Sequence, residues 1–185
     1  MTALVTPDRV RLALASRDRD ALEGPEPRAA VLVPLLSRGG EPSVLLTRRA
    51  SHLRHHAGQY AFPGGRSDPG DLDAVSTALR EAREEVGLAP EAVDVLGLLD
   101  DQPTTSRFVV TPVVGWIPHP YAYTVSDAEV ALAVELPLAP FLEAPASRAM
   151  EFEGRPREVL AYEVDGHFVW GATARMLRGL ALALR

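Results

Sequence analysis

Three glutamates lie close together in the segment 80–88, which reads Arg-Glu-Ala-Arg-Glu-Glu-Val-Gly-Leu. At about 100° per residue, Glu81, Glu84 and Glu85 fall within about 100° of one another on a helix surface. Carboxylates this close repel one another, whereas a hard divalent cation such as Mg²⁺ or Mn²⁺ prefers oxygen ligands and reverses the repulsion. The segment therefore predicts either a metal site or a solvated acidic helix face, where Arg80 and Arg83 form local ion pairs.

The glutamates belong to a predicted helix over residues 71–87. Its apolar residues recur at i, i+4, i+7 and i+11 and form one stripe: Val75, Leu79, Ala82 and Val86. Asp71 or Asp73 can cap the start of this helix, and Gly87 stands where a left-handed C-terminal residue is preferred. The periodicity places the three carboxylates beside the apolar stripe and not on it.

A glycine-rich turn, Phe62-Pro63-Gly64-Gly65, precedes this helix and is followed by an acidic loop with Asp68, Asp71 and Asp73. A pair of glycines lets backbone carbonyl and amide groups approach a metal ion or a phosphate closely. Turn, acidic loop and glutamate helix together favour the metal-site interpretation over a solvated surface.

The remaining pattern predicts an α+β protein, an α/β/α sandwich around a mixed β-sheet, in one domain over residues 1–185. An amphipathic helix and a turn-rich connector over residues 1–27 are expected to pack on that domain. The expected strands cover 29–36, 44–48, 93–98, 108–116, 130–136 and 158–164, and a last helix covers 172–184. Residues 50–70 are expected to be irregular.

Composition excludes several classes of function. The 185 residues carry a net charge of −6, with 19 basic residues that are all arginine, and include no cysteine. Disulfides, cysteine nucleophiles and sulfur-based zinc sites are therefore excluded, and nucleic acid and membrane are not expected as partners. The expected partner is a small-molecule substrate, the oligomeric state stays open, and without an evident signal peptide the expected location is the cytoplasm.

The segment from Gly65 to Leu88 resembles the Nudix box, the signature of hydrolases that act on nucleoside diphosphates linked to another moiety. That pattern reads Gly, five residues, Glu, seven residues, then Arg-Glu-apolar-x-Glu-Glu-x-Gly-apolar. Residues 80–88 match its second half at every position. The first half departs from the pattern, because Asp71 stands at the acidic position and eight residues separate it from Arg80.

A second motif over residues 45–65 is similar to an element of the coenzyme A pyrophosphatases. It reads Leu-Leu-Thr-x-Arg-Ser/Ala, three residues, Arg, three residues, Gly, three residues, Phe-Pro-Gly-Gly, and this chain matches its fixed positions. The resemblance implies a Nudix fold and hydrolysis of the pyrophosphate in coenzyme A to adenosine 3′,5′-bisphosphate and 4′-phosphopantetheine.

The resemblance also implies roles for individual residues. Glu81 and Glu85 are expected to bind Mg²⁺ or Mn²⁺, with the Gly65 carbonyl as a further ligand and Glu84 as a ligand or a group that positions water. Arg80 is expected to orient these carboxylates by ion pairing. The general base is either a box glutamate or an acid on a later loop, for which Glu129 is the candidate; the alternative for Glu129 is an ordinary surface residue.

The substrate-binding candidates lie upstream of the helix. Gly64 and Gly65 are expected to bring the backbone to the substrate, and Arg49 and Arg54 either bind its phosphates or fix the 50–60 loop by salt bridges.

Three alternatives remain. One is another Nudix substrate, such as ADP-ribose, a dinucleoside polyphosphate or a nucleotide sugar. The second is a non-catalytic sensor on the same fold, although such proteins often lack the box glutamates that this chain retains. The third, an isoprenoid isomerase, is disfavoured because its chemistry is expected to need a cysteine.

Overall fold

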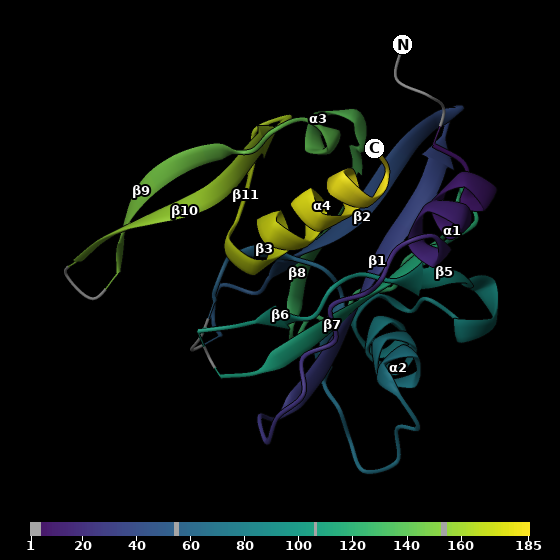
Figure 1. Cartoon of the computed structure of the whole chain (residues 1–185), viewed down its shortest axis with the longest axis horizontal. Helices are drawn as coiled ribbons and strands as arrows, with labels where there is room; N and C mark the ends of the chain where they lie inside the picture. The colour runs from purple at the N-terminus through teal and green to yellow at the C-terminus, as the bar shows by residue number, and fades with distance from the viewer. Residues whose placement is uncertain (1–4, 54–55, 106, 153–154) are drawn as a thin grey trace.

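The structure, a computed structural model, describes residues 5–53, 56–105, 107–152 and 155–185 (Figure 1). The larger sheet contains β1 (Arg28–Arg38), β2 (Glu41–Arg49), β3 (Tyr60–Ala61), β4 (Gly64–Arg66), β5 (Asp94–Leu98), β6 (Gln102–Pro103), β7 (Val109–Trp116) and β8 (Val130–Pro137). The smaller sheet contains β9 (Ala146–Phe152), β10 (Arg155–Val164) and β11 (His167–Trp170). The helices are α1 (Pro7–Ala15), α2 (Ala74–Val86), η1 (Pro90–Ala92, a 3₁₀ turn), α3 (Ala139–Leu142) and α4 (Gly171–Ala183).

The larger sheet is mixed, as the sequence predicts. Its strand order is β3-β2-β1-β7-β5, with β4 paired to β1, β6 to β7 and β8 to β2. β1 and β7 run parallel, and the other pairs are antiparallel. The pairing of β4 with Ala29–Val31 fixes the Gly64–Gly65 turn at the N-terminal end of β1.

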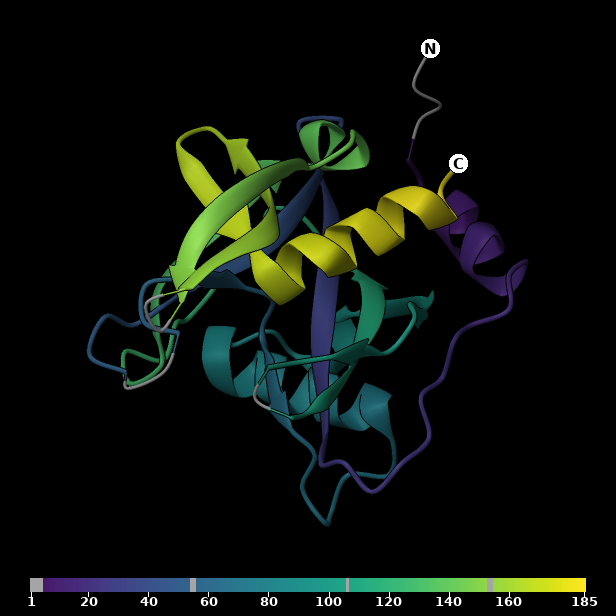
Figure 2. The same ribbon diagram turned by 60° about the vertical axis from the view of Figure 1, so that its left-hand side comes forward.

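Helices cover both faces of this sheet, so the predicted α/β/α sandwich is confirmed (Figure 2). α2 packs on one face through Ala78, Ala82 and Val86, which lie in one buried cluster with Leu32 and Leu45. α1 and α4 contribute to the buried cluster on the opposite face. Burial from both sides explains why β1 reads as an almost continuous apolar run instead of alternating polar and apolar residues.

α2 is shorter than predicted and starts at Ala74 instead of residue 71. Asp73 is the N-cap: its side chain accepts a hydrogen bond from the Ser76 amide at 2.8 Å, and the Ser76 hydroxyl accepts one from the Asp73 amide at 2.9 Å. Asp71 is thereby left for another partner. Gly87 ends the helix with a φ of 69°, the left-handed conformation that the sequence predicted there.

Two regions differ from the predicted elements. The stretch 50–70, expected to be irregular, contains β3 and β4, which are only two and three residues long. β9 and β11 were not predicted, and β10 begins three residues before the expected strand. The β9–β10 hairpin extends away from the larger sheet (Figure 1), so much of β9 is exposed and lacks the apolar alternation that reveals a strand.

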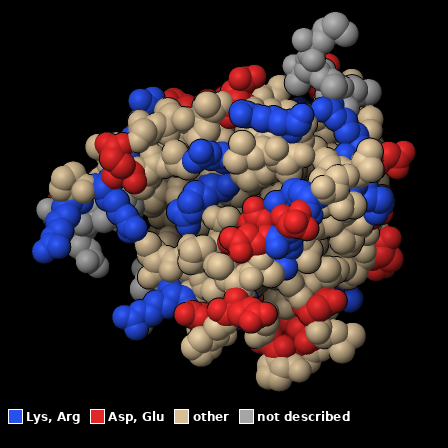
Figure 3. All heavy atoms as spheres, in the orientation of Figure 1, with Lys and Arg blue, Asp and Glu red and all other residues tan. Residues whose placement is uncertain are grey.

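The surface carries separate groups of charge. On the face shown in Figure 3, arginine side chains gather near the start of α4, and acidic side chains gather along the lower edge of the view. None of the helices in the described part of the chain combines the length and the apolar composition needed to span a membrane.

Candidate active site

The Gly64–Gly65 turn allows two close approaches that any side chain would block. A Cβ at Gly64 would lie 2.4 Å from the carbonyl oxygen of Ala30 on the neighbouring strand. A Cβ at Gly65 would lie 2.6 Å from the Oε1 atom of Glu81. The two glycines therefore bring β4 against β1 and place the Glu81 carboxylate directly over the backbone of the turn.

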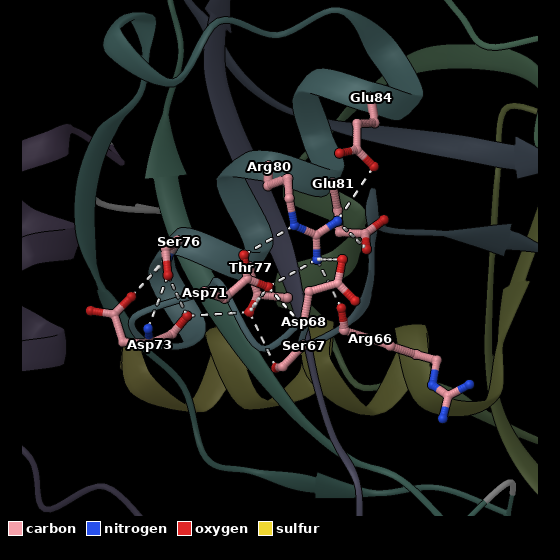
Figure 4. A network of polar contacts seen from close by, with 10 residues as sticks. All are labelled: Arg66, Ser67, Asp68, Asp71, Asp73, Ser76, Thr77, Arg80, Glu81 and Glu84. Atoms are coloured by element: carbon pink, nitrogen blue, oxygen red, sulfur yellow. Dashed lines mark hydrogen bonds and ion pairs between the residues drawn. The ribbon is translucent and has the colours of Figure 1, made fainter.

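Arg80 lies at the centre of a network of acidic side chains (Figure 4). Its Nε and Nη2 atoms donate to the two carboxylate oxygens of Asp71 at 3.0 and 2.9 Å. Its Nη1 atom donates to Glu81 Oε1 at 2.8 Å and to Glu84 Oε2 at 3.4 Å, and Nη2 also donates to the carbonyl oxygen of Arg66 at 2.9 Å. One guanidinium thus fixes the acidic loop, β4 and the glutamate helix relative to one another.

Asp71 occupies the position where the sequence departs from the Nudix pattern. In addition to Arg80, it accepts hydrogen bonds from the Thr77 hydroxyl and the Asp68 amide, both at 2.9 Å. The hydrogen bonds from the Arg80 guanidinium are the main reason why the pKa of Asp71 lies well below its usual range. Asp71 in turn raises the pKa of Arg80. The structure therefore gives Asp71 the role of orienting Arg80, which sequence reasoning left open.

Glu85 lies on the same helix as Arg80, but its surroundings raise the pKa of its carboxyl group, whereas those of Asp71 lower it. The residue is 4% exposed. Burial raises its pKa to about 8, with further increases from the negative charges of Glu129 and Glu81. The positive charge of Arg49 and a hydrogen bond from the Gly64 backbone lower this pKa, but they do not offset the burial.

Glu81 and Glu84 differ in exposure. The Glu81 side chain is 14% exposed, and burial raises its pKa despite the contact with Arg80; Glu84 and Glu129 add to the increase. The Glu84 side chain is 58% exposed and faces solvent beyond Arg80. It borders an open cavity of about 640 Å³ on the outer side of α2, together with Leu79, Arg83 and Pro90.

Glu129 comes to the site through a loop that packs on the end of α2. The Ser126 and Thr124 amides donate to the carbonyl oxygens of Glu85 and Val86, both at 2.9 Å, and so satisfy groups that every helix end leaves unpaired. The Ala50 amide donates to the Glu129 carbonyl oxygen at 2.9 Å. The structure thus brings Glu129 close enough for its charge to act on both Glu81 and Glu85.

Arg49 is a second basic residue at this acidic cluster, in addition to Arg80. It ends β2, is half-buried, and its Nε atom is buried without a hydrogen-bond partner among the described residues. A buried donor without a partner is rare in folded proteins, and a bound anion or a water molecule would satisfy it. The other arginine singled out from the sequence, Arg54, lies outside the described residues.

The donor groups fit a hard divalent cation. Within residues 5–53, 56–105, 107–152 and 155–185, no three histidine or acidic side chains already form a metal-ligating group. Glu81 and Glu85 nevertheless supply carboxylate oxygens, and the Glu81 carboxylate lies directly over Gly65 because that residue has no side chain. Mg²⁺ typically takes one or two carboxylates and completes its shell with water and substrate phosphates, a requirement that this set meets.

Comparison with known proteins identifies the family. A NUDIX domain model matches residues 26–140. A protein of Cronobacter sakazakii described as an uncharacterized Nudix hydrolase NudL is 46% identical over 159 residues, which are 85% of this chain and 82% of the relative. A protein of Enterobacter with the same description is 42% identical over 178 residues, 95% of this chain and 91% of the relative.

Solved structures share the fold at lower identity. A Nudix hydrolase from M. smegmatis, RenU, superposes with a TM-score of 0.53 at 22% identity, covering 62% of this chain and 72% of that one. A C. elegans Ap4A hydrolase binary complex gives a TM-score of 0.51 at 22% identity, covering 61% and 81%. With a family model over more than half of its length and relatives above 40% identity, this chain belongs to the Nudix hydrolases, which act on nucleoside diphosphate derivatives and generally use divalent metal ions.

Proposed function

We propose that this protein hydrolyses the diphosphate bond of coenzyme A or one of its derivatives, releasing adenosine 3′,5′-bisphosphate and 4′-phosphopantetheine. The observation that carries the proposal is the convergence of Glu81, Glu85 and Glu129 beside the Gly64–Gly65 turn, with Arg49 next to them. The proposal includes Mg²⁺ or Mn²⁺ as the cation, one Nudix domain over residues 1–185 and a cytoplasmic location.

The choice of coenzyme A rests on the 45–65 motif. Its first residues lie in β2, and its last residues form the path from β3 to β4. β3 pairs with β2 at Thr47 and Arg48, so the two ends of the motif are neighbours in the sheet. The Gly64–Gly65 end of the motif lies under the Glu81 carboxylate, and we expect a substrate held by the acidic cluster to contact this end of the motif.

The proposed reaction is attack of water on one phosphorus of the diphosphate. Glu81 and Glu85, with the Gly65 carbonyl oxygen, would hold the cation, which when bound neutralises phosphate charge and makes water more acidic. Arg49 is the proposed ligand of a phosphate oxygen, because its positive charge lies beside Glu85 and its Nε atom has no hydrogen-bond partner among the described residues. Arg80 does not need to touch the substrate, because its donors are occupied by Asp71, Glu81, Glu84 and a backbone carbonyl.

Glu129 is the proposed general base, and Glu84 is the alternative. The base takes one proton from the attacking water, whose oxygen forms a bond to phosphorus. The bond from that phosphorus to the bridging oxygen breaks, and the leaving phosphate keeps the electron pair. Glu129 is favoured because its charge acts on both Glu81 and Glu85, whereas Glu84 acts on Glu81 and is paired with Arg80.

A substrate panel tests the proposal. The purified chain is incubated with Mg²⁺ or Mn²⁺ and coenzyme A, ADP-ribose, a dinucleoside polyphosphate or a nucleotide sugar, and the products are separated by chromatography. Preferred cleavage of coenzyme A to the two named products is expected. Fast cleavage of ADP-ribose with coenzyme A spared would replace the substrate assignment, and binding without cleavage of any compound would indicate a sensor.

A further inference from the structure

The connection between β7 and β8 lies along the C-terminal end of α2. The carbonyl oxygens of residues 85–87, three in succession, each accept a hydrogen bond from this connection. The first two donors are the Ser126 and Thr124 amides, both at 2.9 Å. The third donor is the hydroxyl group of Tyr121, at 3.1 Å. The 121–129 segment therefore follows the helix end step by step, and one of its three contacts depends on a side chain.

The Tyr121 hydroxyl group joins two backbone groups that follow α2. It donates to the Gly87 carbonyl oxygen and accepts a hydrogen bond from the Ala89 amide at 2.9 Å. Its ring lies 5.4 Å from that of Tyr123, and both rings pack against the buried cluster that contains Val86. Because phenylalanine has neither the donor nor the acceptor, Y121F would keep the ring in place and leave both backbone groups without this partner.

Gly87 leaves the space that this segment occupies. A Cβ atom at Gly87 would lie 3.1 Å from the Cβ atom of Thr124 and 3.2 Å from its amide nitrogen. Both distances are shorter than an ordinary van der Waals contact, so a side chain here would displace the segment or the helix end. The glycine that ends α2 in a left-handed conformation thus also allows the 121–129 segment to dock there.

The last residue of the segment is Glu129, and its backbone is fixed from two sides. Its amide donates to the carbonyl oxygen of Ser126 at 2.9 Å, and the Ser126 amide is the group that donates to Glu85. Its carbonyl oxygen accepts from the amide of Ala50 at 2.9 Å, directly after Arg49 at the end of β2. The position of Glu129 between α2 and β2 therefore depends on how the segment docks on α2.

We propose that Tyr121 is a positioning residue for the general base: its hydroxyl group holds the 121–129 segment on the end of α2 and so keeps the Glu129 carboxylate within reach of the attacking water. This inference rests on the proposed function, in which Glu129 takes the proton of that water. Tyr121 acts through the segment and does not need to touch the substrate. Displacement of a catalytic group by about 1 Å can cost about 100-fold in rate, so the effect belongs to kcat and not to KM.

A double-mutant cycle tests whether Tyr121 acts through Glu129. The kcat and KM values for coenzyme A are measured for wild type, Y121F, E129Q and the double variant. Y121F is expected to lower kcat about tenfold and to change KM by less than about twofold. E129Q is expected to lower kcat at least about 100-fold, the usual contribution of a general base. In the E129Q background, Y121F should lower kcat by less than about twofold, because the group it positions is already lost.

Y162F is the matched control for Y121F. It also removes a tyrosine hydroxyl group, but Tyr162 lies in the buried cluster on the opposite face of the sheet and its hydroxyl contacts the Glu143 carbonyl oxygen at 3.5 Å. This variant should change kcat by less than about twofold.

Hydrogen exchange provides a measurement that does not depend on turnover. In Y121F, the Thr124 and Ser126 amides should exchange about tenfold faster than in wild type, because the segment loses two hydrogen bonds on α2. Y162F should leave the exchange of both amides unchanged.

The outcomes distinguish the inference from the proposed function. An equal factor for Y121F in the wild-type and E129Q backgrounds, full turnover by E129Q, or unchanged amide exchange in Y121F would each overturn the role of Tyr121. If coenzyme A is spared and another compound of the substrate panel is cleaved, only the proposed substrate is overturned, and the cycle measured with that compound decides the role of Tyr121.

Discussion

Asp101 and Glu85 are both buried carboxylates, but their surroundings carry opposite charge. The Asp101 side chain is 2% exposed and forms ion pairs with Arg19 and Arg28. It also accepts hydrogen bonds from the Thr111 hydroxyl at 2.7 Å and from the Leu22 amide at 3.0 Å. These partners neutralise Asp101 and attach the N-terminal connector to the residue that precedes β6.

Glu85 is buried to a similar extent, but most of its charged neighbours are acids. Glu129 and Glu81 add to the effect of burial on its pKa, and Arg49 opposes them only in part. A protein gains nothing in stability from such a cluster, whereas a bound cation would be stabilised by it. The contrast separates a carboxylate that stabilises the fold from one that is available for chemistry.

The largest expected effect on turnover comes from neutralising Glu85. E85Q keeps the size of the side chain and removes the charge that would hold the cation, so kcat should fall by at least about 100-fold, the order of effect seen when one charge-stabilising group is lost. Turnover of coenzyme A is measured at saturating Mg²⁺ or Mn²⁺. D101N makes the same chemical change at the paired acid and should retain turnover per folded molecule. Comparable losses in the two variants would contradict the distinction.

The next effect concerns the residue that positions the acidic cluster. D71N weakens the bidentate contact with Arg80, so Arg80 no longer fixes Glu81. We therefore expect kcat to fall by about 10- to 100-fold, as for other residues that orient ligands. The kcat and KM values for coenzyme A are measured separately.

D68N is the matched control for D71N. Asp68 also faces Arg80, but at 3.8 Å and with a side chain that is 66% exposed. Its pair is therefore of the exposed kind that contributes at most about 1 kcal/mol, and D68N should change kcat by less than about threefold. Equal effects of D68N and D71N would show that Arg80 needs no oriented partner.

The sequence was sufficient to predict the local features of the site and the fold class. The position of Glu81 and Glu85 on one helix follows from their spacing, and the left-handed Gly87 follows from its place after the last apolar residue. The α/β/α sandwich follows from the order of helical and strand patterns. All of these depend on neighbours in the sequence.

Features that depend on long-range packing did not follow from the spacing of the residues, although the family resemblance names Glu129 as a candidate base. Asp71 and Arg80 are nine residues apart, and their pairing requires the loop to fold back on α2. The approach of Glu129 to Glu85 requires the Thr124–Ser126 amides to dock on the end of α2. β9 was missed for a different reason, because an exposed hairpin strand has no apolar periodicity.

A pH series sharpens the comparison in the metal-free protein. The pKa of Glu85 rises from an ordinary value of 4.5 to about 8 on folding, so between these values the folded state binds more protons than the unfolded state. The free energy of unfolding therefore falls as the pH rises through this window. E85Q lacks this contribution and should be more stable than wild type at pH 9, with the advantage disappearing toward pH 4.5.

Urea unfolding in EDTA measures the difference, and E84Q, at an exposed side chain, serves as the control. Parallel curves for wild type and E85Q would show that Glu85 is not buried as a protonated acid.

The smallest expected effect is on the stability provided by the paired acid. D101N leaves Arg19 and Arg28 without their counter-charge, but both arginines are partly exposed and can be hydrated, with side chains 27% and 38% exposed. The free energy of unfolding should therefore fall by about 2 kcal/mol, less than for a fully buried pair. Urea unfolding at pH 7 measures it, and D94N is the control because the Arg11–Asp94 pair is exposed on both sides and should contribute about 0.5 kcal/mol. If D101N were as stable as wild type, neutralisation by the two arginines would not be what distinguishes Asp101 from Glu85.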